Sequence, residues 1–458
     1  MSIVNTVGKG VAWSTVGTVL GKVFMFANIF IILRYLSVYD YGLGQLVLSV
    51  VSVLGILLLP GLASTIVADL GAERARGEFG RMKSIFRQFF SLSIVLSVVA
   101  WAILFFGSDI AARLSGNDAI GYLLKIASFS LLATPLRMIS ILLASVELRY
   151  FDQALYGIVE EAAKFVCLVI FFFWLQFGLS GLLYAIVISQ FVTALIYVPR
   201  SLSAYRVFGG ASSGDEAAFW HIIREHRKWS IATSYVGSLG QTLQLWIIRL
   251  LLGTEAVGLF AFASGIMGQV ASFLPLGNVL APLLPRYVDK KIDFARYVRS
   301  AIKAQVLFGV LFILAALVAL PVLIFIFPKY ALAVPIVTVL IWGILPASIV
   351  SVYTPAFAAL KQQFAYFWST VWKIACTAVF TPIAILLWGI PGIGLGGVLT
   401  LSVSALERTW RLKRQLPEFS LVSKDFFSLD IHERNLIRTL LESSKMRSLI
   451  SFLMPKDR

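Results

Sequence analysis

Long apolar stretches separated by short polar connections run along almost the whole chain. A helix that crosses a bilayer needs about 20 mostly apolar residues, and by that measure the sequence predicts about twelve spanning helices. The first six are expected at 11–33, 42–66, 88–107, 121–146, 155–177 and 181–198. The second six are expected at 229–252, 256–284, 304–327, 331–359, 366–388 and 391–406. The predicted architecture is an all-α integral membrane protein with an N-lobe (1–198), a cytoplasmic linker (199–228), a C-lobe (229–406) and a basic tail (407–458).

Composition agrees with this pattern. Of the 458 residues, 59% are apolar and 14% are charged, whereas a soluble domain has roughly 45–50% apolar and 25% charged residues. A soluble fold of this length cannot bury so much apolar surface, but a bilayer covers it. Cys167 and Cys376 lie inside apolar stretches without a Cys or His at metal-binding spacing. Neither a disulfide nor a metal site is therefore expected.

The basic residues predict the orientation of the spans, because cytoplasmic loops carry an excess of Lys and Arg. Alternate connections hold the basic residues Arg74, Arg76, Arg81, Lys83, Arg87, Arg200, Arg206, Arg224, Arg227, Lys228, Arg286, Lys290, Lys291, Arg296, Arg299 and Lys303. The opposite connections hold little beyond Arg34, Arg113 and Lys329. Both termini are therefore predicted to be cytoplasmic. The net charge of +16 is interpreted as a topology signal, and nucleic-acid binding is not expected because no compact basic domain is present.

The two halves of the sequence resemble each other. Three landmarks recur 216 residues later: Trp13-Ser14 as Trp229-Ser230, Leu36-Ser37 as Leu252-Gly253, and Gly42-Leu43 as Gly258-Leu259. Six spans in each half give both halves the same orientation, which is the parallel kind of repeat. Such proteins usually place a substrate site between the halves and expose it to each side in turn. The repeat therefore predicts a transporter.

Three segments carry a resemblance to a known family: Gly10-Val11-Ala12-Trp13-Ser14, Arg34-Tyr35-Leu36-Ser37-Val38-Tyr39-Asp40-Tyr41-Gly42, and Ala72-Glu73-Arg74-Ala75-Arg76-Gly77-Glu78. They resemble the Wzx-type polysaccharide flippases of the multidrug/oligosaccharidyl-lipid/polysaccharide (MOP) superfamily, and the likeness covers about residues 8–406. The resemblance implies the MATE-like MOP fold. It also implies that an undecaprenyl-diphosphate-linked oligosaccharide moves from the inner to the outer leaflet of the bacterial cytoplasmic membrane, for polysaccharide or O-antigen synthesis. The tail beyond Leu406 departs from the family's usual short ending.

Charged residues deep inside spans are the candidate substrate-binding groups, because an ionisable group in hydrocarbon usually faces a cavity or a partner. We hypothesise that cations of the spans line a positive cavity that attracts the diphosphate, with Arg favoured for its fork geometry. The candidates are Lys22, Arg137, Lys164, Arg249 and Lys373. Arg249 lies near the outer end of its span and can instead extend to the interface.

Two neighbouring carboxylates are the candidate coupling groups. Glu160 and Glu161 are four and three residues before Lys164, so each can reach it on one helix face. They form either an internal ion pair or a site that loads H⁺ or Na⁺ as the cavity switches sides. Trp246 and Trp372 are possible sugar-stacking residues, although an aromatic ring in a span is more often packing or an interface anchor. No organic cofactor is expected, and a monomer suffices for two lobes around one cavity.

The tail from Asp430 has apolar residues on one predicted helix face and arginines on the other. That pattern favours an amphipathic helix on an anionic membrane surface, and docking of a polysaccharide-assembly protein is the other interpretation.

Three other functions are alternatives to a glycan flippase. A cation-coupled drug exporter is expected to favour an acidic or apolar cavity, and a lipid II-type flippase is expected to carry two extra C-terminal spans. A membrane glycan polymerase or glycosyltransferase needs sizeable outward loops with catalytic residues, whereas the longest outward connection here is about residues 107–120. The sequence therefore predicts a transporter without catalytic residues.

Overall fold

The structure is a computed structural model, and it describes residues 20–58, 66–67, 70, 73, 76–147, 149–206, 228–272 and 284–419. Within these residues every regular element is a helix. Nine of the described helices are long and apolar enough to cross a membrane. The predicted all-α membrane fold is therefore confirmed.

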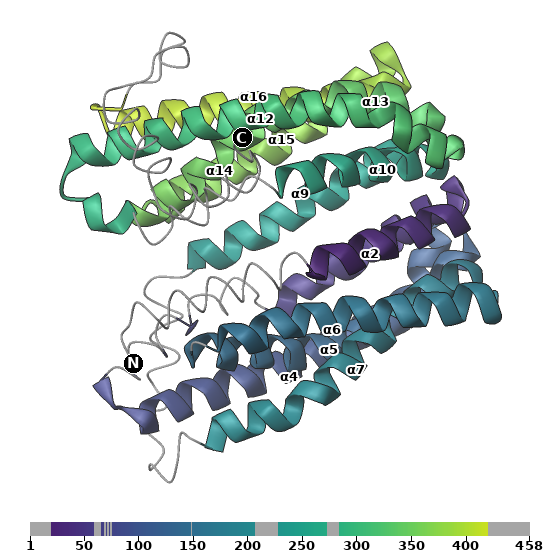
Figure 1. Cartoon of the computed structure of the whole chain (residues 1–458), viewed down its shortest axis with the longest axis horizontal. Coiled ribbons are helices and arrows are strands. Elements are labelled where there is room, and N and C mark those ends of the chain that lie inside the picture. The colour runs from purple at the N-terminus through teal and green to yellow at the C-terminus, as the bar shows by residue number, and fades with distance from the viewer. Residues whose placement is uncertain are drawn as a thin grey trace, which may run out of the picture.

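The N-lobe contains the first half of the described helices (Figure 1). Residues 20–35 are helical, and the remaining elements follow at short intervals. They are α2 (Val38–Gly55), η1 (Ile56–Leu58), α4 (Phe79–Ser115), α5 (Asp118–Val146), α6 (Tyr150–Val169), the π-helical turn η2 (Ile170–Trp174) and α7 (Gly178–Arg206). Each overlaps one predicted span, and α6 with η2 forms the predicted fifth span as one continuous helix.

The C-lobe contains the second half. Its helices are α9 (Lys228–Leu252), α10 (Thr254–Ala271), η3 (Leu284–Tyr287), α12 (Lys291–Ile326), η4 (Pro328–Ala333), α13 (Val334–Leu340), η5 (Ile341–Gly343), α14 (Ile344–Ala359), α15 (Gln363–Trp388) and α16 (Ile390–Gln415). The elements from η4 to α14 together make the predicted span at 331–359, with two 3₁₀ turns in it. Helical structure therefore overlaps each of the six predicted spans of this half, and residues 273–283 of the span predicted at 256–284 lie outside the described residues.

Two predicted domain boundaries differ from the helices. α7 continues through Pro199 to Arg206, although the linker was expected from residue 199. α16 continues to Gln415, although the tail was expected from residue 407. Both helices extend past the apolar stretch that defined the span, because a window of apolar residues finds only the part of a helix that faces lipid. The amphipathic segment predicted from Asp430 lies outside the described residues.

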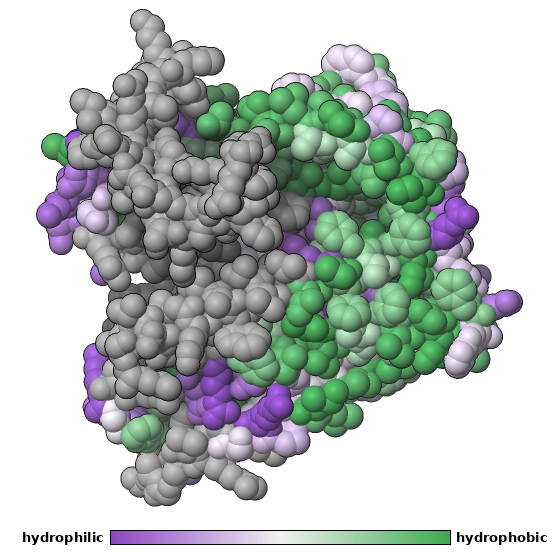
Figure 2. Space-filling view, in the orientation of Figure 1, coloured by the Kyte–Doolittle hydropathy of each residue, from purple (hydrophilic) through white to green (hydrophobic). Residues whose placement is uncertain are grey.

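Figure 1 shows the two lobes as two helical bundles side by side. Large apolar side chains such as Phe325 and Val318 are exposed on the outside of the bundles, as expected where lipid is the solvent. In Figure 2 this hydrophobic surface extends over both lobes, and hydrophilic residues are visible between them.

The structure confirms the repeat of the sequence. α2 and α10 each contain 18 residues, and both bounds of α10 lie 216 positions after those of α2. These two helices pack against each other across the lobe boundary (Figure 1). An apolar cluster at the same place combines Leu33, Val38 and Leu46 of the N-lobe with Ile248 and Phe260 of the C-lobe. The two lobes therefore share a core at this end, which we call the closed end.

Candidate functional site

Backbone packing between α2 and α10 seals the closed end. A Cβ atom on Gly42 would overlap the carbonyl oxygen of Thr254 and would lie 2.7 Å from the backbone nitrogen of Gly258. A Cβ atom on Gly258 would overlap the carbonyl oxygen of Val38. Val38 and Thr254 are themselves one repeat apart, so the contact is the same from both sides. Only glycine at both positions permits this approach.

Lys329 strengthens the closed end from the C-lobe. Its Nζ donates hydrogen bonds to the carbonyl oxygens of Leu36 and Arg34, at 3.2 Å for Arg34. These carbonyls end the helix at 20–35, where a cation also interacts favourably with the helix dipole. Phe30 and Phe327 make an edge-to-face contact beside it, with ring centroids 5.4 Å apart.

Away from the closed end, the hydrogen bonds between the described parts of the two lobes involve side chains. Lys22 Nζ donates to Ser272 Oγ at 3.1 Å, and Gln269 Nε2 lies 3.7 Å from Met25 Sδ. Thr242 Oγ1 donates to the carbonyl oxygen of Ser49 at 3.2 Å. Side-chain contacts of this kind can exchange with water, whereas the glycine contact at the closed end requires the backbones to separate.

The N-lobe pairs its buried charges with one another. Arg137 on α5 lies 3.4 Å from Glu160 on α6, and Glu160 is only 8% exposed. On the same helix, Lys164 donates to Glu161 at 2.7 Å. Of the two pairings expected for Lys164, the one with Glu161 is therefore formed, and Glu160 instead reaches across to α5. Sequence spacing describes only one helix and could not show the partner from the next.

Asn28 joins the second pair from the helix at 20–35. Its Nδ2 donates to Glu161 Oε2 at 2.8 Å and to the Glu161 carbonyl at 3.0 Å. Its Oδ1 is buried and has no partner among the described residues. Glu161 thus lies between the ammonium group of Lys164 and the amide of Asn28, and the Oδ1 of that amide is an acceptor without a partner among the described residues.

The C-lobe contains a cavity of about 710 Å³, which is within the ~300–1,000 Å³ of typical small-ligand sites. Helices α9, α10, α13, α14, α15 and α16 form its walls. Hydroxyl and amide side chains make up much of the lining: Thr233, Ser234, Gln241, Gln244, Ser264, Thr354, Gln363, Tyr366, Thr370, Thr377 and Thr400. This composition fits a polar ligand.

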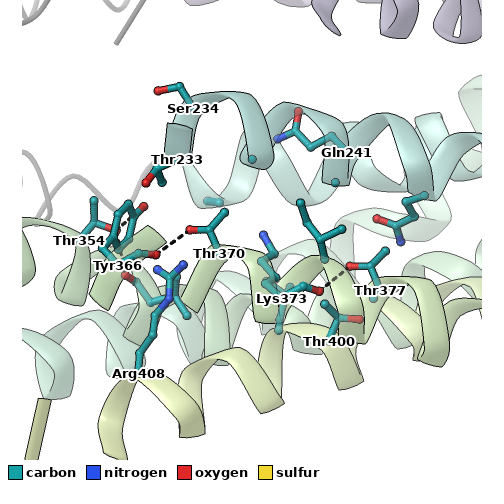
Figure 3. Close-up of a pocket in the computed structure, with 18 of the residues that line it drawn as sticks. Thr233, Ser234, Gln241, Thr354, Tyr366, Thr370, Lys373, Thr377, Thr400 and Arg408 are labelled. Carbon is teal, nitrogen blue, oxygen red and sulfur yellow. Dashed lines mark hydrogen bonds between the residues drawn. The ribbon is translucent and has the colours of Figure 1, made fainter. Parts of the chain in front are cut away.

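Two cations line the same cavity, Lys373 on α15 and Arg408 on α16. In Figure 3 both side chains point from their helices toward α9. Arg408 is 3% exposed, and its guanidinium lies 4.8 Å from the ring centroid of Tyr366. In the described part of the chain, neither cation forms an ion pair or a side-chain hydrogen bond. The charges of the C-lobe cavity are therefore uncompensated, in contrast to those of the N-lobe.

The predicted substrate-binding cations do not gather in this one cavity. Of the five, all within the described residues, only Lys373 lines it. Lys22 lies at the lobe boundary, Arg137 and Lys164 belong to the N-lobe pairs, and Arg249 stacks over Trp246 at 4.9 Å. Trp372 is half exposed and is not among the lining residues. Whether these residues bind substrate stays a prediction.

Sequence reasoning missed Arg408, because the charges after Leu406 were assigned to the tail. A signal was present in Thr400, Ser404 and Arg408, which recur every four residues and so share one helix face. All three are buried, and each has a polar side-chain atom without a partner among the described residues. For metals, no group of three or more His, Cys, Asp or Glu side chains that could hold an ion occurs in the parts of the chain described above.

The sequence profile of a family described as polysaccharide biosynthesis protein matches residues 7–288. No curated protein sequence matches the chain.

Three solved structures share the fold at low identity. An inward-facing multidrug resistance MATE family transporter of the MOP superfamily has a TM-score of 0.70 at 16% identity, covering 88% of this chain and 96% of that one. The lipid II flippase MurJ, in an inward closed conformation, has a TM-score of 0.70 at 13% identity, covering 96% and 95%. An outward-facing MATE transporter has a TM-score of 0.69 at 15% identity, covering 90% and 97%. The fold is therefore the MOP fold, as the resemblance implied.

Proposed function

The chain belongs to the polysaccharide biosynthesis protein family, and on that premise we propose that it is a flippase for lipid-linked oligosaccharide. It moves an undecaprenyl-diphosphate-linked glycan from the inner to the outer leaflet of the bacterial cytoplasmic membrane by alternating access. The glycan and diphosphate pass between the lobes, while the polyprenyl chain stays in lipid. The polypeptide itself carries out no catalytic step, and a monomer is sufficient.

The observation that carries this proposal is the junction of the two lobes at Gly42 and Gly258. Alternating access requires two rigid bodies that separate at one end while they close at the other. Backbone packing at one end and side-chain contacts elsewhere supply such an arrangement. Basic residues are concentrated in the connections opposite the closed end, which supports a cytoplasmic location for those connections and an outer location for the closed end.

Electrostatics favour an anionic substrate over the cationic drugs of an exporter. An arginine side chain stays protonated in proteins, so the C-lobe interior keeps a positive charge at Arg408. Lys373 adds a second cation to the same wall. A cationic drug would meet repulsion there, and an anionic head group would meet attraction. The multidrug exporter remains the alternative that the experiment below distinguishes.

Glu161 is the favoured coupling residue. It accepts hydrogen bonds from Asn28 and Lys164, and the free Oδ1 of Asn28 provides a second oxygen for H⁺ or Na⁺. Glu160, which is paired with Arg137, is the more structural of the two predicted coupling carboxylates.

Proteoliposomes that contain the purified protein test the function. A short-chain lipid-linked glycan is placed in one leaflet, and its arrival in the other is followed with and without a proton or sodium gradient. We expect movement that a gradient accelerates, and no transport of a cationic dye. Transport of the dye without movement of the glycan would establish the drug exporter instead.

A further inference from the structure

Two cations of the C-lobe cavity, Arg408 and Lys373, have no ion-pair partner in the part of the chain that the structure describes. Arg408 Nε and one terminal nitrogen, Nη1, are buried and have no hydrogen-bond partner among the described residues. The neighbouring carboxylate on the helix, Glu407, accepts instead from Arg411. Lys373 lines the same cavity as Arg408. Within the described residues, neither cation of this cavity forms an ion pair with a carboxylate.

Such an arrangement is unstable unless something else supplies the anion. A buried charge needs a partner with hydrogen bonds, and arginine cannot escape by losing its proton. The ring of Tyr366 attracts the guanidinium but accepts no conventional hydrogen bond from it. An anionic group of a ligand that enters the cavity would supply this partner.

The hydroxyl groups next to the cations indicate what else that ligand carries. Thr400 Oγ1 and Ser404 Oγ have no partner among the described residues, and they lie about two turns and one turn before Arg408 on the same helix. Thr370 and Thr377 line the wall on α15 (Figure 3). Several hydroxyls beside one charged centre match a polyhydroxylated ligand with one anionic group.

We propose that the C-lobe cavity binds an acidic sugar of the transported glycan, with Arg408 and Lys373 holding its carboxylate and the threonine hydroxyls contacting its ring. This deepens the flippase function proposed above and rests on it. The planar guanidinium of Arg408 matches a carboxylate in a bidentate geometry. A lipid-linked glycan without an acidic sugar gains nothing from this site.

The diphosphate is a poorer occupant of the cavity than a sugar. It is attached directly to the polyprenyl chain, which must remain in the hydrocarbon of the bilayer. In the described part of the chain, all the residues that line the cavity belong to the C-lobe. Sugars farther from the lipid can enter it while the tail remains outside, and a group next to the tail cannot do so as easily.

Binding of soluble probes to the full-length protein in lipid nanodiscs tests this site directly. The probes are glucuronate as the acidic sugar, glucose as the neutral control and inorganic pyrophosphate as the diphosphate. We expect saturable glucuronate binding that raises the melting temperature, and no comparable effect of glucose. Arg408→Gln should weaken glucuronate binding by roughly tenfold or more, since a charge-assisted hydrogen bond is lost.

Lys413→Gln is the matched control, because Lys413 is an exposed cation on the same helix. It should bind glucuronate as the wild type does. Arg408→Gln should also melt at the same or a higher temperature than the wild type without ligand, since it removes a buried unpaired charge. Loss of binding would then not be explained by loss of folding.

Three results would overturn the inference: no glucuronate binding to the wild type, equal binding to Arg408→Gln, or Arg408-dependent binding of pyrophosphate alone. A flipping assay separates this inference from the general function. Arg408→Gln should slow a glucuronate-containing lipid-linked glycan more strongly than a neutral one, whereas Lys413→Gln should move both glycans as the wild type does. If the wild type moves neither glycan, the flippase function fails, whereas equal slowing of both glycans contradicts the acidic-sugar site alone.

Discussion

Gly42 and Gly258 meet backbone to backbone across the boundary of the two lobes, one sequence repeat apart. Each occupies the position at which a side chain would collide with the partner helix, at the carbonyl of Thr254 or of Val38. The sequence repeat therefore places matching glycines at the contact that must break when the closed end opens. A contact made by two backbones is either fully formed or broken, which is the behaviour that a gate requires.

The first prediction concerns this contact. Gly258→Ala should open the closed end, because the added methyl group cannot be accommodated beside the Val38 carbonyl. Overpacking of this kind costs about 1–3 kcal/mol, which shifts a two-state equilibrium by roughly 5- to 150-fold. Double electron–electron resonance between spin labels at residues 39 and 255, in a background without Cys167 and Cys376, should show a longer distance in the variant.

Gly265→Ala provides the control for that measurement. Gly265 lies on the same helix, and a Cβ atom there would meet no atom within 4 Å. Its label distances should match those of the wild type. An unchanged distance distribution in Gly258→Ala would show that the glycine contact does not hold the gate.

The second prediction concerns Lys329. Lys329→Gln should also favour the open state, because the carbonyls of Arg34 and Leu36 lose a charged donor from the opposite lobe. The effect should be smaller than that of Gly258→Ala, with an upper limit of ~2 kcal/mol for a cation at a helix C-terminus. The same pair of spin labels measures it, and a larger shift than in the glycine variant would contradict the ranking.

The third prediction separates structure from coupling at Arg137 and Glu160. Arg137→Gln alone should destabilise the protein by on the order of 1–3 kcal/mol, because it leaves the buried Glu160 without its cation. The expected loss of stability is smaller than for a fully buried pair, because the Arg137 side chain is 45% exposed. Adding Glu160→Gln should restore most of the stability. Thermal unfolding in detergent gives the double-mutant cycle, and additive losses would exclude a pair.

The fourth prediction concerns coupling. Glu161→Gln should leave glycan movement insensitive to a proton or sodium gradient, because the amide can neither be deprotonated nor neutralise a cation. Glu160→Gln should retain the gradient dependence. Flux in proteoliposomes with and without the gradient checks both variants. If Glu160→Gln and not Glu161→Gln abolishes the dependence, the assignment of the two carboxylates is reversed.

Hydrophobic pattern and repeat were sufficient to predict the fold. The bilayer requires long apolar helices, so the spans are visible in the sequence, and the pair Gly42 and Gly258 set the offset that α2 and α10 follow residue for residue. The charged site was less predictable. Contacts such as Arg137 with Glu160 join different helices. They depend on the rotation of each helix about its own axis, which residue spacing within one helix does not determine.

Arg408 shows where the prediction of spans from apolar residues fails. A span defined by apolar residues ends where charges begin, yet α16 carries Arg408 inward on the face that it shares with Thr400 and Ser404. Helical periodicity of polar residues beyond the apolar stretch was the available signal. Lys373 was identified because it stands alone within an apolar span, where a charge is conspicuous.

The most direct test of the central account is to lock the closed end during transport. Cysteines in place of Tyr39 and Glu255, one turn from the glycine contact on either lobe, are joined by a reducible bifunctional thiosulfonate in the background without Cys167 and Cys376. Movement of lipid-linked glycan in proteoliposomes is then measured before and after reduction. Alternating access predicts that the cross-link stops movement and that reduction restores it. Undiminished glycan movement with the closed end locked would contradict the account.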